Sequence, residues 1–290
     1  MLKVIASLIS YCPLPMIYGL SDILAPMAGL LYRRKVVDKN LRQVFPLHSP
    51  KTLKAIRKEF YRNLLDTSLE TFKSLRFSEK ELEGRMKVVE DAVYLEAVSS
   101  DEPFLIYCAH YGNWEWLIQR GGEVLPCIYF MYKPLKSQGA DQLMLSIRSR
   151  TGSVPVATQE TRKILKDKGI YKAVAMVADQ SPHRSNPSKI WAKFFQQETP
   201  FYQGIFVLPY LTQLPAYYAA LKRVSRGYYE VELKLLGKPG YKKNDFSVLK
   251  NYLAVCEEQI KNNPADWLWS HNRWKYRRPK DEPLLDFAGD

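Results

Sequence analysis

The chain has 290 residues, of which 46% are hydrophobic and 25% are charged, and this balance excludes a disordered or fibrous protein. Lys and Arg outnumber Asp and Glu by 43 to 30, which gives a net charge of +13. Such a basic chain is expected to meet a polyanion: nucleic acid, anionic lipid or an acidic carrier protein. Aromatic residues make up 13%, which suits a protein with part of its surface near lipid.

The basic charge is concentrated in two stretches. Residues 33–62 hold ten Lys and Arg against two acidic residues, and residues 271–280 hold five with no acidic residue. The rest of the chain is neutral overall, so we expect one or two docking patches, on an anionic membrane surface, and no nucleic-acid partner. A solvated helix face is the alternative explanation of each run.

The four cysteines are scattered and none form a C-x-x-C pair, which excludes a zinc ribbon. A disulfide framework is not expected in a chain long enough to build its own core, so the sequence favours a reducing compartment.

Residues 4–32 form an apolar segment whose one charge is Asp22. The segment is too long for a signal peptide and lacks a cleavage site before a polar mature start. Prolines interrupt it, and its longest smooth piece, residues 16–32, would extend about 26 Å against a hydrocarbon core of about 30 Å. We therefore expect residues 1–32 to be a membrane anchor that is either short and tilted or lies in the interface. The alternative is a helix buried in the soluble core.

Three basic residues, Arg33, Arg34 and Lys35, follow this segment directly. By the positive-inside rule they place the remainder of the chain on the cytoplasmic face of the inner membrane. Their position also lets them meet anionic headgroups.

The rest of the chain alternates helical and strand patterns. Apolar residues at helical spacing predict a helix over 53–75, and later patterns predict helices near 141–150, 158–167 and 246–261. Short apolar runs predict strands at 104–109, 124–131 and 172–178, and alternation predicts a hairpin of 217–224 with 229–235. This order indicates an α/β fold with a parallel component, and residues 33–290 are expected to form a single domain.

The sequence His110-Tyr111-Gly112-Asn113-Trp114-Glu115 follows the strand pattern FLIYCA directly. Gly112 and Asn113 favour a turn, and Asn113 is a good N-cap for a helix that opens at Trp114. Such a turn would bring Glu115 within reach of His110. A carboxylate that fixes one imidazole nitrogen leaves the other free to take a proton from a hydroxyl. A packed core histidine is the alternative on spacing alone.

Other catalytic signatures are missing from the sequence. It contains no G-x-S-x-G, no H-E-x-x-H, no P-loop and no G-x-G-x-x-G. With only four histidines a His-rich metal site is not expected, and we expect neither a metal nor a cofactor.

The segment HYGNWE resembles the H-x4-D/E motif of glycerolipid acyltransferases, and more narrowly the HFGNWE form of the bacterial lipid A late acyltransferases. Further segments resemble that family in the same order along nearly the whole chain: RRKVV with Asn40-Leu41, Tyr132-Lys133-Pro134-Leu135, Arg148, Ala178-Asp179-Gln180, Phe194-Phe195 with Thr199-Pro200, and Pro264 through Lys275. The resemblance implies a glycerolipid acyltransferase-like mixed sheet flanked by helices, with an N-terminal membrane-anchoring helix.

The same resemblance implies an acyltransferase that moves a fatty acyl chain from acyl carrier protein or acyl-CoA to a hydroxyl of a lipid A precursor. In this scheme His110 is the general base and Glu115 orients it. Arg148 would bind a substrate phosphate or the developing oxyanion, and the helix start at Asn113 and Trp114 would line the substrate site. Asp179 would also belong to the substrate site, in a supporting rather than a catalytic role.

Three alternatives remain open in the sequence. The acceptor could be another lipid, a lysophospholipid or an amino-acid lipid, because the chain departs from the family pattern at Gln196-Gln197, Phe201-Tyr202 and Asn272. Cys108 could form an acyl-enzyme, although a packed core cysteine fits its position better. The protein could also be a non-catalytic membrane-binding scaffold.

Overall fold

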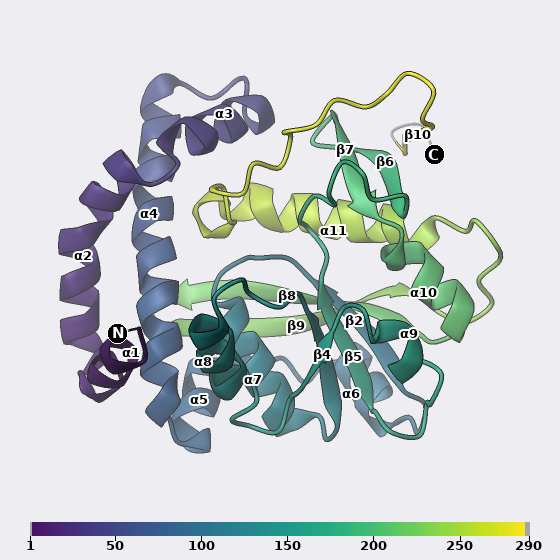
Figure 1. Cartoon of the computed structure of the whole chain (residues 1–290), viewed down its shortest axis with the longest axis horizontal. Helices are drawn as coiled ribbons and strands as arrows, with labels where there is room; N and C mark the ends of the chain where they lie inside the picture. Colours follow the sequence, from purple (N-terminus) through teal and green to yellow (C-terminus); the bar gives the residue numbers. More distant parts are fainter. Residues whose placement is uncertain (1, 288–290) are drawn as a thin grey trace.

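The computed structural model describes residues 2–287 and has a seven-stranded sheet at its centre (Figure 1). The strands follow the order β1-β9-β8-β2-β5-β3-β4 across the sheet. Their bounds are β1 Met86–Val88, β2 Phe104–Cys108, β3 Ile128–Tyr132, β4 Val154–Ala157, β5 Ala173–Val177, β8 Ala216–Ser225 and β9 Tyr228–Gly237.

The sheet is mixed, as predicted. Strands β8, β2, β5, β3 and β4 run parallel to one another, whereas β9 is antiparallel to β8 and β1 is parallel to β9. Every side chain of β2 is buried, which is typical of a parallel strand that is covered on both faces. The carboxyl ends of β2 and β5 therefore lie at one edge of the sheet, next to each other.

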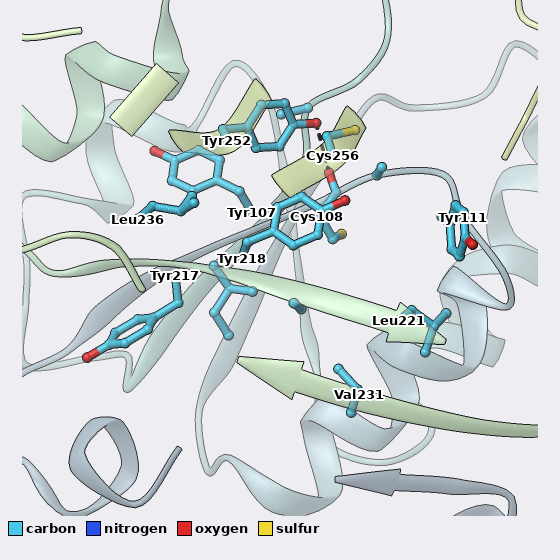
Figure 2. Close-up of a cluster of buried hydrophobic side chains, with 14 of the residues drawn as sticks. Tyr107, Cys108, Tyr111, Tyr217, Tyr218, Leu221, Val231, Leu236, Tyr252 and Cys256 are labelled. Carbon is cyan, nitrogen blue, oxygen red and sulfur yellow. Dashed lines mark hydrogen bonds between the residues drawn. The ribbon is translucent and has the colours of Figure 1, made fainter. Parts of the chain in front are cut away.

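Helices cover both faces of the sheet (Figure 1). One face is covered by α7 (Trp114–Val124), with α5 (Glu79–Arg85) and α6 (Ala92–Ser99) beside it and α8 (Gln138–Arg148) packed on α7. The other face is covered by α11 (Ser247–Asn262), where Tyr107 and Tyr218 of the sheet pack around Tyr252 (Figure 2).

A smaller sheet of three strands lies on the α11 side. It joins β10 (Leu284–Leu285), β6 (Lys189–Phe194) and β7 (Gln197–Tyr202). The chain then enters α10 (Gly204–Thr212), and a short α9 (Thr161–Ile164) precedes β5.

The N-terminal helices pack against the long helix α4 (Pro50–Lys73) along one side of the molecule (Figure 1). Ser49 caps it, because the Ser49 hydroxyl accepts a hydrogen bond from the backbone N–H of Thr52. The preceding helices are α1 (Leu2–Tyr11), α2 (Leu14–Leu31) and α3 (Arg34–Val44).

Helix α2 lies against α4 with one face only. Its buried residues are Leu14, Ile17, Ser21 and Ala25, which recur at helical spacing. Gly29 brings the two helices close, since a Cβ atom there would lie 3.3 Å from the ring of Tyr61. By length and composition α2 is the one described helix that could cross a membrane.

Most of the predicted elements are confirmed: the helix over 53–75, the strands at 104–109 and 172–178, the 217–235 hairpin and the last helix. Two predictions were wrong in extent. Residues 124–127 end α7 and form a turn, so β3 starts only at Ile128, and the helix predicted over 158–167 is the single turn of α9. The short strand β4 and the strands β6 and β7 were not predicted.

The two basic stretches lie side by side in the fold. Arg33 Nη1 donates to the backbone carbonyl of Ser270 at 3.1 Å, and Lys39 Nζ donates to that of Trp274 at 3.4 Å. Tertiary packing thus joins α3 and the C-terminal segment into one basic surface that begins where the apolar helix α2 ends.

Candidate active site

The segment from His110 to Glu115 turns sharply between β2 and α7. Gly112 has a φ of +55°, a left-handed conformation that favours glycine, and a Cβ atom there would lie 2.9 Å from the end of the Leu221 side chain, which would have to shift. Asn113 then caps α7, because its Oδ1 accepts from the backbone N–H of Trp116 at 2.9 Å. The predicted turn and helix cap are therefore present, and they leave His110 at the carboxyl edge of the sheet.

His110 is held by the residues that follow the neighbouring strand β5. Its Nδ1 lies 2.6 Å from Oδ1 of Asp179, and the Gln180 amide nitrogen lies 3.2 Å from its Nε2. A carboxylate can only accept, so Nδ1 carries the proton and Nε2 presents its lone pair. The His110 side chain keeps 20% exposure, while Asp179 is buried. This arrangement holds the ring in one tautomer and one orientation, with Nε2 as the nitrogen that can accept a proton.

The Asp179 carboxylate stays ionised although it is buried. Burial raises the pKa of this carboxyl, but the attraction of His110 and the hydrogen bonds from His110 and the Trp267 indole hold the pKa at about 2. Trp267 Nε1 donates to Asp179 Oδ2 at 2.8 Å, so each carboxylate oxygen has a donor. The carboxylate therefore keeps its negative charge beside the imidazole.

The prediction that Glu115 orients His110 is wrong in this structure. Glu115 accepts two hydrogen bonds from Arg148, at 2.7 Å from Nε and 2.6 Å from Nη2, and one from the Trp114 indole at 3.0 Å. Glu115 lies in the first turn of α7, on the side that faces α8, whereas β5 is hydrogen-bonded to β2 directly. The carboxylate nearest to His110 in sequence thus joins α7 to α8, and a distant one reaches the imidazole.

The other predicted substrate-binding residues divide into two groups. Asn113 is fully buried, and its Nδ2 donates to Glu70 at 2.7 Å, so it shapes the turn and does not reach a substrate. Trp114 is partly exposed, and its ring meets the His110 ring edge-on with centroids 5.3 Å apart. Arg148 is 18% exposed and already paired with Glu115. Trp114 and Arg148 are therefore the two that remain near accessible space.

Cys108 does not have the environment of a nucleophile. It is buried, and desolvation raises the pKa of its thiol well above the ordinary value. Reactive cysteines need the opposite shift, because the thiolate is the attacking form. An acyl-enzyme at Cys108 finds no support in this geometry.

An apolar cavity of about 80 Å³ lies between α7 and the sheet. Small side chains open it on the sheet side, and its lining includes Ile106, Cys108, Leu117, Gly121, Ala175 and Ala219. Cys108, which precedes His110 by two residues, lines the cavity, whereas His110 itself does not. Among the described residues, no group of three or more His, Cys, Asp or Glu side chains could hold a metal ion.

Sequence reasoning missed the pairing of His110 with Asp179, as well as the parts played by Gln180 and Trp267. One signal was available: His110 and Asp179 each follow a buried apolar strand by two residues. Parallel strands bring such residues to one edge, but the sequence pattern does not state which strands are neighbours.

Comparisons with known proteins relate nearly the whole chain to acyltransferases. Among solved structures the chain resembles the 1-acyl-sn-glycerophosphate (LPA) acyltransferase PlsC from Thermotoga maritima, with 13% identity over 88% of this chain and 99% of that one and a TM-score of 0.36. The curated proteins give no match. A family model described as bacterial lipid A biosynthesis acyltransferase matches residues 2–276. The chain therefore belongs to the bacterial lipid A biosynthesis acyltransferase family and is an acyltransferase that acts on a lipid.

Proposed function

We propose that this enzyme moves a fatty acyl chain from acyl carrier protein or acyl-CoA to a hydroxyl of a lipid A precursor, with His110 as the general base. The observation that carries the proposal is the hydrogen bond between His110 Nδ1 and Asp179. It leaves Nε2 as the acceptor of the hydroxyl proton, and Asp179 stabilises the imidazolium that forms.

The reaction needs no enzyme nucleophile. The hydroxyl oxygen attacks the thioester carbonyl as its proton passes to His110 Nε2. The tetrahedral intermediate then expels the thiolate, which takes the proton from the imidazolium and leaves as a thiol. The Gln180 amide, now 3.2 Å from Nε2, occupies the position of the acceptor hydroxyl and has to yield it when the lipid binds. A positioned base contributes about 10²–10⁴-fold, so the remaining acceleration comes from placement of the substrates and stabilisation of the oxyanion.

Arg148 has only one guanidinium nitrogen free of Glu115 with which to bind a substrate anion. Two of its nitrogens are engaged by Glu115, which leaves Nη1 for a phosphate or the oxyanion. We assign the Glu115–Arg148 pair to the wall of the site, where it holds α8 against α7.

The apolar cavity between α7 and the sheet is the proposed acyl site. Its lining is almost entirely apolar, and burial of each methylene group contributes about 0.8 kcal/mol. Cys108 at the end of β2 lines this cavity, so an acyl chain seated there would lie near the strand end that His110 follows.

We place the enzyme on the cytoplasmic face of the inner membrane, with α1 and α2 in the plane of the interface rather than across it. The face of α2 that points away from α4 exposes a row of large apolar side chains: Met16, Leu20, Ile23, Met27, Leu30 and Leu31. The basic surface of α3 continues this face and suits anionic headgroups.

Two polar contacts in the first half of α2 oppose a spanning orientation. Asp22 pairs with Arg226 at 2.9 Å, and the Tyr18 hydroxyl donates to Glu70 at 2.8 Å. A helix that left α4 to cross the bilayer would carry both groups into hydrocarbon without these partners, which is costly.

The test of the reaction is incubation of the membrane-reconstituted enzyme with a mixture of acyl carrier proteins, acyl-CoA and a lipid A precursor, with product masses read by mass spectrometry. We expect an acylated precursor, its loss in His110→Ala and its retention in His48→Ala, which removes an exposed imidazole. Acylation of a lysophospholipid or an amino-acid lipid in place of the precursor would move the assignment to that acceptor. No transfer to any lipid by a folded wild-type protein would leave the scaffold alternative.

Membrane placement is tested with impermeant maleimide on sealed inverted vesicles, in a background where Cys12 and Cys127 are replaced by serine. The probes are Lys3→Cys and Arg34→Cys, one at each end of the apolar helices. Labelling of both from the cytoplasmic side is expected for the in-plane orientation. Labelling of Arg34→Cys alone would mean that the segment spans.

A further inference from the structure

The C-terminal segment Asp266–Arg273 contacts both parts of the chain that carry the His110–Asp179 pair: the turn after β2 and the loop after β5. At the turn after β2, Leu268 N–H donates to the His110 carbonyl at 3.0 Å, and Gly112 N–H donates to the Asp266 carbonyl at 3.0 Å. Tyr111 and Trp267 also form an isolated antiparallel bridge. The segment therefore runs beside the turn that carries His110 as a short extra strand.

The same segment also fixes the loop that follows β5. Ser181 N–H donates to His271 Nε2 at 3.2 Å, and Arg273 Nη1 donates to the Ser181 hydroxyl at 2.7 Å. Ser181 stands two residues after Asp179, so the loop that presents Asp179 and Gln180 is held from its far side.

Trp267 is the residue of this segment that touches the pair itself. Its indole donates to Asp179 Oδ2, the oxygen that His110 leaves free, and its side chain is 2% exposed. The ring packs edge-on against Trp269, with centroids 4.7 Å apart, and against Phe194 at 6.1 Å. With the ring fixed by packing, the N–H has one direction in which to point, toward the carboxylate.

We propose that Trp267 is a positioning residue of the acyl transfer, which acts through Asp179 to set both the orientation and the basicity of His110. The proposal rests on His110 being the general base, as proposed above. A carboxylate with two donors spreads its charge over both hydrogen bonds and is held in one plane. Removal of the indole donor concentrates the charge on the oxygen facing His110 and lets the carboxylate rotate.

Two consequences follow for Trp267→Phe, which keeps an apolar ring but lacks the donor. The imidazolium is stabilised more by the less shared carboxylate, so the pKa of His110 rises and the acid limb of the pH–rate profile moves to higher pH. The looser orientation lowers kcat by about 10–100-fold, the size expected for one hydrogen bond to a charged group. The KM of the acyl donor stays unchanged, because the indole does not line the acyl cavity.

Trp269→Phe is the matched control. Trp269 is equally buried, lies on the same segment and donates its indole N–H at 2.6 Å to the carbonyl of Pro264, not to the pair. It should lose stability to a similar extent but keep the pH profile of the wild type.

The experiment measures kcat and kcat/KM from pH 5 to pH 9 for the wild type, both tryptophan variants and His110→Ala, together with the titration of the His110 ring by nitrogen-15 NMR. We expect an upward shift of the His110 pKa and of the acid limb in Trp267→Phe alone. Equal losses of kcat in the two tryptophan variants, with no shift in either profile or titration, would overturn the positioning role. A His110→Ala enzyme that still transfers acyl groups would instead overturn the general-base assignment, so the two failures are distinguishable.

Discussion

His110 Nδ1 lies 2.6 Å from Asp179 Oδ1, although the two residues follow different strands and are 69 positions apart. The carboxylate that the H-x4-E spacing suggested, Glu115, is bound to Arg148 instead. One carboxylate thus pairs with an imidazole and the other with a guanidinium, and each has a distinct expected effect on activity.

Replacement of Asp179 by asparagine should lower kcat by about 10²–10⁴-fold, because the imidazolium loses its stabilising charge. Glu115→Gln should lower kcat less than tenfold, since it weakens only the contact between α7 and α8. The check is to measure the kcat of acyl transfer for the two purified variants and to compare each with the wild type. A larger loss in Glu115→Gln than in Asp179→Asn would restore the role predicted from the sequence.

If the apolar cavity between α7 and the sheet is the acyl site, as proposed, it should set the length of the transferred chain. Ala219 and Ala220 are neighbours on β8, but Ala219 lines the cavity and Ala220 lies on the opposite face of the sheet. Ala219→Leu is expected to shift the products toward shorter acyl chains, because the larger side chain fills the space. Competition among donors of different length, read by mass spectrometry, should leave the profile of Ala220→Leu as in the wild type. An unchanged profile in Ala219→Leu would remove the cavity from the acyl site.

Protonation of His271 should destabilise the protein in acid. Burial, followed by the charge of Arg273, lowers the pKa of His271 to about 4, and its neutral Nε2 accepts the Ser181 N–H. The folded-state pKa lies below the unfolded value of about 6.5, so the stabilisation is complete above that pH and is lost as the pH falls through 4.

The folded and unfolded pKa values differ by roughly 2.5, so at about 1.4 kcal/mol per pH unit the loss amounts to at most about 3.5 kcal/mol. Denaturant unfolding of the wild type and His271→Gln at pH 7 and pH 4.5 measures it, with exposed His48→Gln as the control. We expect the pH dependence to shrink only in His271→Gln. The same slope in all three proteins would contradict the assignment.

Arg226 should matter more for stability than its exposed partner does. It bridges Asp22, which is half exposed, and Asp66, which is fully buried and lies 2.7 Å away. Arg226→Gln leaves Asp66 with Arg223 alone and should lower the free energy of unfolding by about 3 kcal/mol, the lower end of the cost of breaking a buried pair. Asp22→Asn removes the exposed half of the bridge and should cost no more than about 1 kcal/mol. Equal losses in the two variants would mean that the buried half contributes little.

Much of the fold was predictable because its signals are local. The run FLIYC predicts β2, the spacing of apolar residues predicts α4, and Gly112 with Asn113 predicts the turn and cap before α7. The edge strand β4 contains Pro155 and is four residues long, so it carried no strand pattern. Strands β6 and β7 mix charged and apolar residues and are defined by their pairing with each other.

The sequence alone determined that His110 stands at the end of a buried strand, ahead of a capped helix, with a carboxylate five residues on. Only the tertiary structure decided which carboxylate holds the imidazole. The order of strands in a sheet depends on hydrogen bonds between distant segments, and placing β5 beside β2 carries Asp179 to His110. The helix that opens at Trp114 turns Glu115 toward α8, where Arg148 neutralises it. Trp267, from the far end of the chain, completes the carboxylate because burial demands a donor for its second oxygen.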